Sequence, residues 1–380
     1  MIPTYYQVHL ESQLSHANYI FLKILMTVLQ SIKKVSLEGI ATAIPIPILF
    51  ESRRRRLQRF LSLPNLTMEK TWFPIVKAWL KVNFKIEEMI YIVIDRTNWE
   101  NTNLFVVSVV WNKRAFPVYC EKLDKKGSSN IEEQTKIISK ILPLFKKYKV
   151  CVLGDREFCS IKLANWLHEQ KVYFCTRLKK NTYVTVEKEL ATQLESTGLK
   201  PGNSFFYEGV KITKQNGFGS FNIAAKWKSN NSKKKANEGW FLVTNLEGLE
   251  IAISSYEKRF GIEEMFRDFK TGGYNLEDTK VSENRLISLI ILISIAYTSA
   301  TIQGKIIVNS GVQKYVGRVK ESKRNVKRHS SFYIGLYGKN WVSSGENCRE
   351  LVAELMKLSR NKIAYYQRGL RAMSLIIAAS

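Results

Sequence analysis

The sequence is poor in acidic residues and in the residues that build disulfide or zinc scaffolds. Its 380 residues contain 33 Asp and Glu against 59 Lys and Arg, which gives a formal net charge of +26. The five cysteines are widely spaced without a C-x-x-C pair, and there are four histidines. These shortages argue against a disulfide-rich secreted protein and against a structural zinc site, and they favour a reducing compartment.

Long hydrophobic runs are also scarce. The apolar residues 20–29 follow a polar segment and precede no small-residue cleavage site, so we expect no secretory signal. The most apolar stretch, Leu286–Ile302, is at the lower length limit for a membrane span and contains several hydroxyl side chains. A span is one interpretation, but a single short run in a strongly basic chain favours a buried core helix. We therefore expect no membrane partner.

The chain does contain a large positive charge on a composition that can fold. Hydrophobic residues make up 45% and aromatic residues 12% of the sequence. That is enough apolar surface for a sizeable core, which argues against a basic disordered tail. A net charge this far from zero predicts a polyanionic partner.

The first 85 residues have helical periodicity, interrupted by Pro45 and Pro47. Ser36 is expected to cap a short second helix, and residues 51–61 to form a third. That third helix carries five arginines: Arg53, Arg54, Arg55, Arg56 and Arg59. A basic third helix in a compact helical unit is typical of a DNA reader of the helix-turn-helix kind, and a solvated basic surface is the alternative.

From residue 89 the pattern changes to strands. Apolar β-rich runs and helical periodicity alternate in the order β-β-β-α-β-α-β, over residues 89–94, 103–111, 115–120, 131–148, 150–153, 161–170 and 172–176. This order predicts an α/β core. Asp95 and Asp155 each follow an apolar strand directly, and ligands bind at the carboxyl ends of strands in α/β sheets. Two such carboxylates could hold a divalent cation.

Residues 180–250 contain short β-like segments and read as a mostly β insertion, after which a helix is expected over about 254–271. At 100° per residue this helix places five polar side chains on one face: Tyr256, Arg259, Glu263, Arg267 and Lys270. The face would present a single acid among three cations and a phenol. An ordinary amphipathic helix with i, i+4 ion pairs is the alternative.

These residues carry a resemblance to a known family. The spacing Tyr256-x2-Arg259-x3-Glu263-x6-Lys270 is similar to the Y-R-E-K signature of DDE transposases of the insertion-sequence-four type, the group related to the Tn-five transposase. The segments I-D-R-T-N-W around Asp95 and G-D-R-E-F around Asp155 resemble the blocks around that family's first two acids. With E-S-R-R-R at residues 51–55, the resemblance extends over nearly the whole chain.

The resemblance implies an RNase H-like core in which Asp95, Asp155 and Glu263 are catalytic and hold two Mg²⁺ ions, for which Mn²⁺ would substitute. Trp240 is similar in place to the family's tryptophan that stacks on a flipped base, and burial in the insertion's own core is the alternative. The remaining expected DNA contacts are the other signature residues, the cation Arg267 on the same helix face and the N-terminal arginines: Tyr256, Arg259, Lys270, Arg267, Arg53, Arg54, Arg55, Arg56 and Arg59.

We expect five regions. They are a helical DNA-binding domain (1–85), the first part of the core (86–180), the β-rich insertion (181–250), the helical completion of the core with the catalytic Glu (251–310) and a basic C-terminal region (311–380). The implied function is cut-and-paste DNA transposition through metal-dependent hydrolysis and strand transfer, by way of a hairpin intermediate.

The expected partners are terminal inverted repeats, target DNA and a second copy of the chain. The expected location is the cytoplasm of a prokaryote, at the nucleoid when DNA is bound. Two alternatives stay open. One is a transposase relic that binds DNA without catalysis, and the other is a nuclease of the RNase H fold that only cuts.

Overall fold

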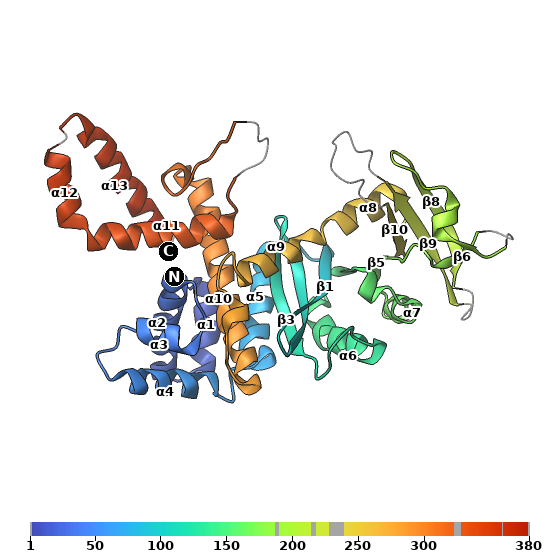
Figure 1. Cartoon of the computed structure of the whole chain (residues 1–380), viewed down its shortest axis with the longest axis horizontal. Coiled ribbons are helices and arrows are strands. Elements are labelled where there is room, and N and C mark those ends of the chain that lie inside the picture. Colours follow the sequence, from blue (N-terminus) through green and yellow to red (C-terminus); the bar gives the residue numbers. More distant parts are fainter. Residues whose placement is uncertain are drawn as a thin grey trace. The chain divides into compact units, whose positions relative to one another are not determined.

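A computed structural model describes residues 2–186, 190–213, 218–227, 239–322, 328–358 and 360–378 (Figure 1). Contacts divide the chain into two compact units. One combines Met1–Ile75 with Asp268–Ser380, and the other is Val76–Arg267. The first unit is helical, and the second contains the sheet, so the protein is mixed α/β.

The helical unit joins the two ends of the chain (blue and red in Figure 1). Its helices are α1 (Thr4–Gln13), α2 (His16–Ile32), α3 (Leu37–Ala43), α4 (Phe50–Leu61), α10 (Glu283–Asn309), α11 (Ser331–Asn347), α12 (Arg349–Lys357) and α13 (Ile363–Ala378). Short helical turns lie at Leu276–Asp278, Gln313–Tyr315 and Arg360–Lys362. A π-helical turn, Met68–Trp72, leads into α5 (Phe73–Asn83), which crosses from this unit into the next.

Helix α10 is the core element of this unit. Within the described residues it is the one helix long and apolar enough to cross a membrane, but 89% of its most apolar window is buried inside the protein. The Thr298 hydroxyl is satisfied within the unit, since it donates to the Ser294 carbonyl and accepts from Tyr6. Gly304 and Gly335 let α10 and α11 cross closely, because a Cβ on Gly304 would lie 1.7 Å from the Ser331 carbonyl oxygen. The expected core helix is therefore present.

The arginine-rich helix is the fourth helix of the chain and not the third. Residues 4–32 form two helices, because Leu14 is extended and the Ser15 side chain accepts from the Asn18 N–H to start α2. Helix α1 buries Tyr6 and Leu10 but has no strong apolar face, which is why its periodicity is weak in the sequence. Ser36 caps the helix after it, as expected, by accepting from the Gly39 N–H.

The second unit is built on one ten-stranded sheet, in the order β3-β2-β1-β4-β5-β10-β9-β8-β6-β7. The strands are β1 (Met89–Trp99), β2 (Thr102–Trp111), β3 (Arg114–Lys122), β4 (Lys149–Gly154), β5 (Tyr173–Arg177), β6 (Tyr183–Thr185), β7 (Thr192–Gln193), β8 (Ser204–Ile212), β9 (Phe218–Lys226) and β10 (Trp240–Thr244). The helices are α6 (Ile131–Ile141), α7 (Ile161–Glu169), α8 (Leu249–Glu257) and α9 (Phe260–Phe269), with short turns at Leu142–Phe145, Arg156–Phe158 and Leu194–Thr197.

The sheet has a mixed core and an antiparallel extension. Strand β1 is parallel to β4, β4 is parallel to β5, and β1, β2 and β3 form the expected antiparallel meander. Strand β10 then pairs antiparallel with β5, so the residues expected as an insertion continue the same sheet. The polar loop predicted over 229–238 lies outside the described residues.

Two predicted boundaries are wrong. The first strand does not end at Asp95 but continues to Trp99, because Asp95 pairs with Val106 and Trp99 with Thr102 in the hairpin with β2. The helix expected over 131–148 ends at Ile141 and is followed by a tighter 3₁₀ turn that contains Pro143. Proline has no backbone N–H, so it cannot donate the next hydrogen bond of an α-helix.

Candidate active site

The sheet brings Asp95 and Asp155 together. Strands β1 and β4 are parallel neighbours with Val93 opposite Leu153, so the two acids lie at equivalent places two residues further on. Asp95 accepts from the Arg96 N–H at 2.7 Å. Asp155 follows β4 directly and accepts from the Glu157 N–H at 2.8 Å, which starts the turn after the strand.

Negative charge is concentrated around Asp95. The pKa of Asp95 is raised to about 6, chiefly by burial; the charges of Asp155 and Glu263 also raise it, whereas the Arg96 N–H and the Arg259 guanidinium lower it. The three carboxylates are therefore within electrostatic reach of one another, and they supply the hard oxygen donors that Mg²⁺ and Mn²⁺ prefer. A cation at this place would relieve the repulsion among them.

Arg259 supplies such a cation within the protein. Its Nη1 lies 3.3 Å from Oδ2 of Asp95, its Nη2 donates to Glu263, and the residue is 8% exposed. Within the described part of the chain, no three His, Cys, Asp or Glu side chains are gathered closely enough to hold a metal ion together. The acids fit a divalent cation by donor type and charge, and Arg259 balances two of them here.

The signature residues do not lie on one continuous helix, so the single helix expected over 254–271 is wrong. Helix α8 ends at Glu257 and α9 begins at Phe260, with i→i−3 hydrogen bonds through Lys258 and Arg259 between them. Gly261 approaches β3 so closely that an added Cβ would lie 2.7 Å from the Arg114 carbonyl oxygen. The chain thus turns where α9 packs on the sheet, and the turn directs Arg259 toward Asp95.

Tyr256 and Trp240 form an aromatic group beside Arg259. Their rings meet edge to face at 5.2 Å, and Trp240 lies 5.9 Å from the ring of Phe260. Tyr256 is buried, and burial raises its pKa, whereas the Arg259 charge lowers it. Trp240 is half-buried at the start of β10. From the sequence, Trp240 and Tyr256 could be linked only through the resemblance to the transposase family, since they lie in different elements.

The last two cations of the expected helix face, Arg267 and the signature residue Lys270, lie further along the chain. Arg267 is exposed near the end of α9 and pairs with Glu264. Glu264 also accepts from Arg114 at 3.2 Å, so this acid is engaged on the side of β3. Lys270 belongs to the helical unit and pairs with Glu277 at 2.6 Å.

An ion pair that sequence reasoning missed joins the segments that carry the two aspartates. Arg96 donates through Nε and Nη2 to both oxygens of Glu157, and through Nη1 to Asn103 at 2.9 Å. Ser129 adds its N–H and hydroxyl to the same carboxylate. The available signal was the presence of opposite charges one residue after Asp95 and two residues after Asp155.

The arginines of α4 divide into two groups. Arg53 donates to the Ile44 carbonyl at 3.1 Å, Arg54 pairs with Glu38 at 3.2 Å, and Arg56 lies over the ring of Phe21. The other two, Arg55 and Arg59, are exposed. The structure thus separates arginines that stabilise the helical unit from arginines whose side chains face solvent.

Comparisons with known proteins give one family match. No curated protein matches the chain. Among solved structures, the cryo-EM structure of the piggyBac transposase synaptic complex with hairpin DNA is similar, with a TM-score of 0.46 and 12% identity over 90% of this chain and 77% of that chain. The family model described as the transposase DDE domain matches residues 100–299, which include Asp155 and Glu263 and begin just after Asp95. Since that match covers more than half of the chain, the protein belongs to the DDE transposase domain family.

Proposed function

We propose that the chain is a cut-and-paste transposase of the insertion-sequence-four type. It would hydrolyse the strands at the ends of a mobile element, proceed through a hairpin and join the element to target DNA. The proposal rests on the family match and on the charged site formed by β1, β4 and α9. In this interpretation the sheet unit is an RNase H-like core with a β extension, and the N-terminal helices form a DNA-binding domain.

The observation that carries the catalytic part is the arrangement around Asp95. Keeping a buried carboxylate beside two other acids is unfavourable for folding, and such sites are commonly functional. Asp95, Asp155 and Glu263 would hold Mg²⁺, or Mn²⁺ in its place. The bound ions would supply charge neutralisation at the attacking and leaving oxygens of the phosphodiester.

The chain's own cations and rings would handle the DNA end. Arg259 is placed to exchange its contacts with Asp95 and Glu263 for a phosphate when a metal balances those acids. Trp240 would stack on a displaced base, and Tyr256 would hold the Trp240 ring in place through their edge-to-face contact. Arg267 and Lys270 would hold neighbouring phosphates. A homodimer would hold both element ends, in the cytoplasm of a prokaryote.

The test is cleavage and strand transfer on a plasmid that carries paired element ends. Asp95→Asn, Asp155→Asn and Glu263→Gln should each reduce cleavage by about 100-fold or more, because charge stabilisation in the transition state is lost. DNA binding should be retained, since no phosphate contact is removed. Glu264→Gln is the matched control, because Glu264 is engaged with Arg114 and should not affect cleavage.

The same assay separates the alternatives. A relic that only binds DNA would give no cleavage in Mg²⁺ or Mn²⁺ with the unchanged chain, and an RNase H-fold nuclease would cut without joining ends to target DNA. Full activity of the Glu263→Gln variant would contradict the assignment of the third acid.

A further inference from the structure

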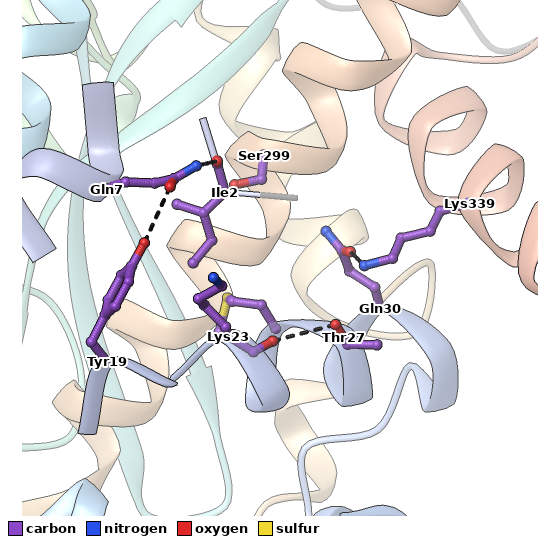
Figure 2. A pocket seen from close by; sticks show the side chains of 9 residues that line it. Ile2, Gln7, Tyr19, Lys23, Thr27, Gln30, Ser299 and Lys339 are labelled. Atoms are coloured by element: carbon purple, nitrogen blue, oxygen red, sulfur yellow. Dashed lines mark hydrogen bonds between the residues drawn. The ribbon is translucent and has the colours of Figure 1, made fainter. Parts of the chain in front are cut away.

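A cavity of about 110 Å³ lies within the helical unit, lined by side chains from α1, α2, α10 and α11 (Figure 2). All of its lining residues belong to this unit, whereas the acids described above belong to the sheet unit. Its volume exceeds what one water molecule needs several-fold. The cavity is therefore large enough for a small polyatomic ligand.

The cavity is lined by a half-buried cation, Lys339, that has no acidic partner in the described part of the chain. Nζ of Lys339 donates to Oε1 of Gln30 at 2.7 Å, and Figure 2 shows these two side chains meeting at one side of the cavity. In the described part of the chain, no carboxylate forms an ion pair with Lys339. An ammonium group has three N–H donors, so a neutral amide leaves most of its capacity unused. Lys23 lines the same cavity and brings a second positive charge.

Neutral donors add to this excess. Ser299 is 1% exposed, and its hydroxyl has no hydrogen-bond partner. Gln30 is 2% exposed, and its amide nitrogen reaches the Ala296 carbonyl at 3.5 Å, the outer limit of a hydrogen bond. Buried polar groups are rarely left unsatisfied in proteins. The Ser299 hydroxyl lacks an acceptor and the Gln30 amide has only a long contact, so a ligand could provide a better acceptor for both.

The side of the cavity formed by α1 provides few acceptors that could pair with these donors. The acceptor oxygen of Gln7 is taken by the Tyr19 hydroxyl at 3.3 Å, and the Gln7 amide donates to the Ile2 carbonyl at 2.7 Å. Glu11 interacts with Tyr19 but does not line the cavity. The lining therefore combines two lysines with unpaired donors and contains no carboxylate.

We propose that this cavity binds a small oxyanion of the phosphate class, held by Lys339, Ser299 and Gln30, with Lys23 nearby. The anion is either free inorganic phosphate or a phosphate group of DNA. Charge-assisted hydrogen bonds from a shielded lysine are stronger than those between neutral groups. The site goes beyond the proposed catalytic function and does not depend on it.

The test is thermal unfolding of the full chain in increasing inorganic phosphate, with sodium chloride adjusted to hold ionic strength constant. A specific site should give a saturable rise in melting temperature. Lys339→Met should weaken the apparent affinity for phosphate by about ten-fold or more, because a charged donor is lost. Ser299→Ala, a milder change, should weaken it by a smaller factor.

Lys305→Met is the matched control. Lys305 lies on α10 of the same unit, and burial lowers its pKa as it does for Lys339, but it does not line the cavity. The control should keep the phosphate response of the unchanged chain. Equal phosphate responses in the unchanged chain and in both the Lys339→Met and Ser299→Ala variants would overturn the proposal, as would no saturable response at all.

A DNA-binding measurement distinguishes the two sources of the anion. If the site takes a DNA phosphate, saturating inorganic phosphate and Lys339→Met should both weaken duplex binding at constant ionic strength. If it takes free phosphate, duplex binding should be the same with and without phosphate, while the thermal response remains. Either result supports the site, provided that Lys339→Met removes the thermal response.

Discussion

Arg96 of β1 donates to both carboxylate oxygens of Glu157, its Nε lying 2.9 Å from Oε1 and its Nη2 3.0 Å from Oε2. The side chains are only 16% and 15% exposed. Because Arg96 follows Asp95 and Glu157 lies two residues after Asp155, the pair links the backbone segments that place the two acids. A shielded two-pronged ion pair fixes geometry better than an exposed contact does.

This relationship predicts that the pair positions Asp95 and Asp155, the acids proposed to bind metal. Arg96→Met and Glu157→Gln should each weaken Mn²⁺ binding and DNA cleavage by about 10- to 100-fold, the usual effect of losing a group that orients metal ligands. Isothermal titration with Mn²⁺ and the cleavage assay measure the two effects separately. The exchange of Arg96→Glu with Glu157→Arg should recover part of the Mn²⁺ affinity, and single variants with unchanged Mn²⁺ affinity would contradict the prediction.

A second prediction concerns the contacts of Arg259 with Asp95 and Glu263. Because this guanidinium competes with a metal for the two carboxylates, Arg259→Met should strengthen Mn²⁺ binding by about ten-fold, the size of a neighbouring cation's effect on a carboxylate. DNA cleavage should nevertheless fall, since the proposed phosphate contact of Arg259 would be lost. Arg259→Lys keeps the charge and should change Mn²⁺ affinity less. Weaker Mn²⁺ binding in Arg259→Met would show that the arginine supports the metal site and does not compete with it.

A third prediction separates the two interpretations of Trp240. Its ring contacts Tyr256 and Phe260, and the residue is half-buried at the start of β10. Trp240→Ala should slow hairpin formation by about ten-fold or more while first-strand nicking changes little, because stacking is lost only when a base leaves the duplex. Trp240→Phe should retain part of the rate. Equal slowing of nicking and hairpin formation would return Trp240 to a packing role.

Much of the sheet unit follows from its sequence. The apolar strands, the two helices between them and the strand-end position of Asp155 are encoded in local periodicity and appear in the predicted order, although the first helix ends early at Ile141. The continuation of β1 beyond Asp95 is not encoded in local periodicity, because Asp95–Trp99 are mostly polar and form a strand only by pairing with β2. Long-range pairing of this kind overrides local preference.

The site shows the same division. The resemblance predicted that Asp95, Asp155 and Glu263 belong to one site. The sheet register explains why the first two lie together. The turn between α8 and α9 could not be predicted from local sequence, because it depends on the close approach of Gly261 to Arg114, which lies far away in sequence. The placement of Arg259 between two acids follows from that turn and could not be read from helical periodicity.

The last prediction concerns the arginines of α4. Arg55 and Arg59 lie one helical turn apart and are exposed, whereas Arg53 donates to backbone carbonyls of its own unit. If α4 binds the element end, replacing Arg55 or Arg59 with Ala should each reduce the slope of log affinity against log salt by about one, the value for one lost phosphate contact. Binding titrations at several salt concentrations measure this slope.

Arg53→Ala is the control, and it should lower the free energy of unfolding by about 1 kcal/mol through its lost hydrogen bonds while leaving the salt slope unchanged. A guanine contact by Arg55 or Arg59 would add roughly 1–3 kcal/mol of preference for the inverted repeat over random duplex. Unchanged slopes in both variants would remove α4 from the DNA interface. Recognition would then fall to the β extension or to the basic segment 314–329, of which residues 323–327 lie outside the described structure.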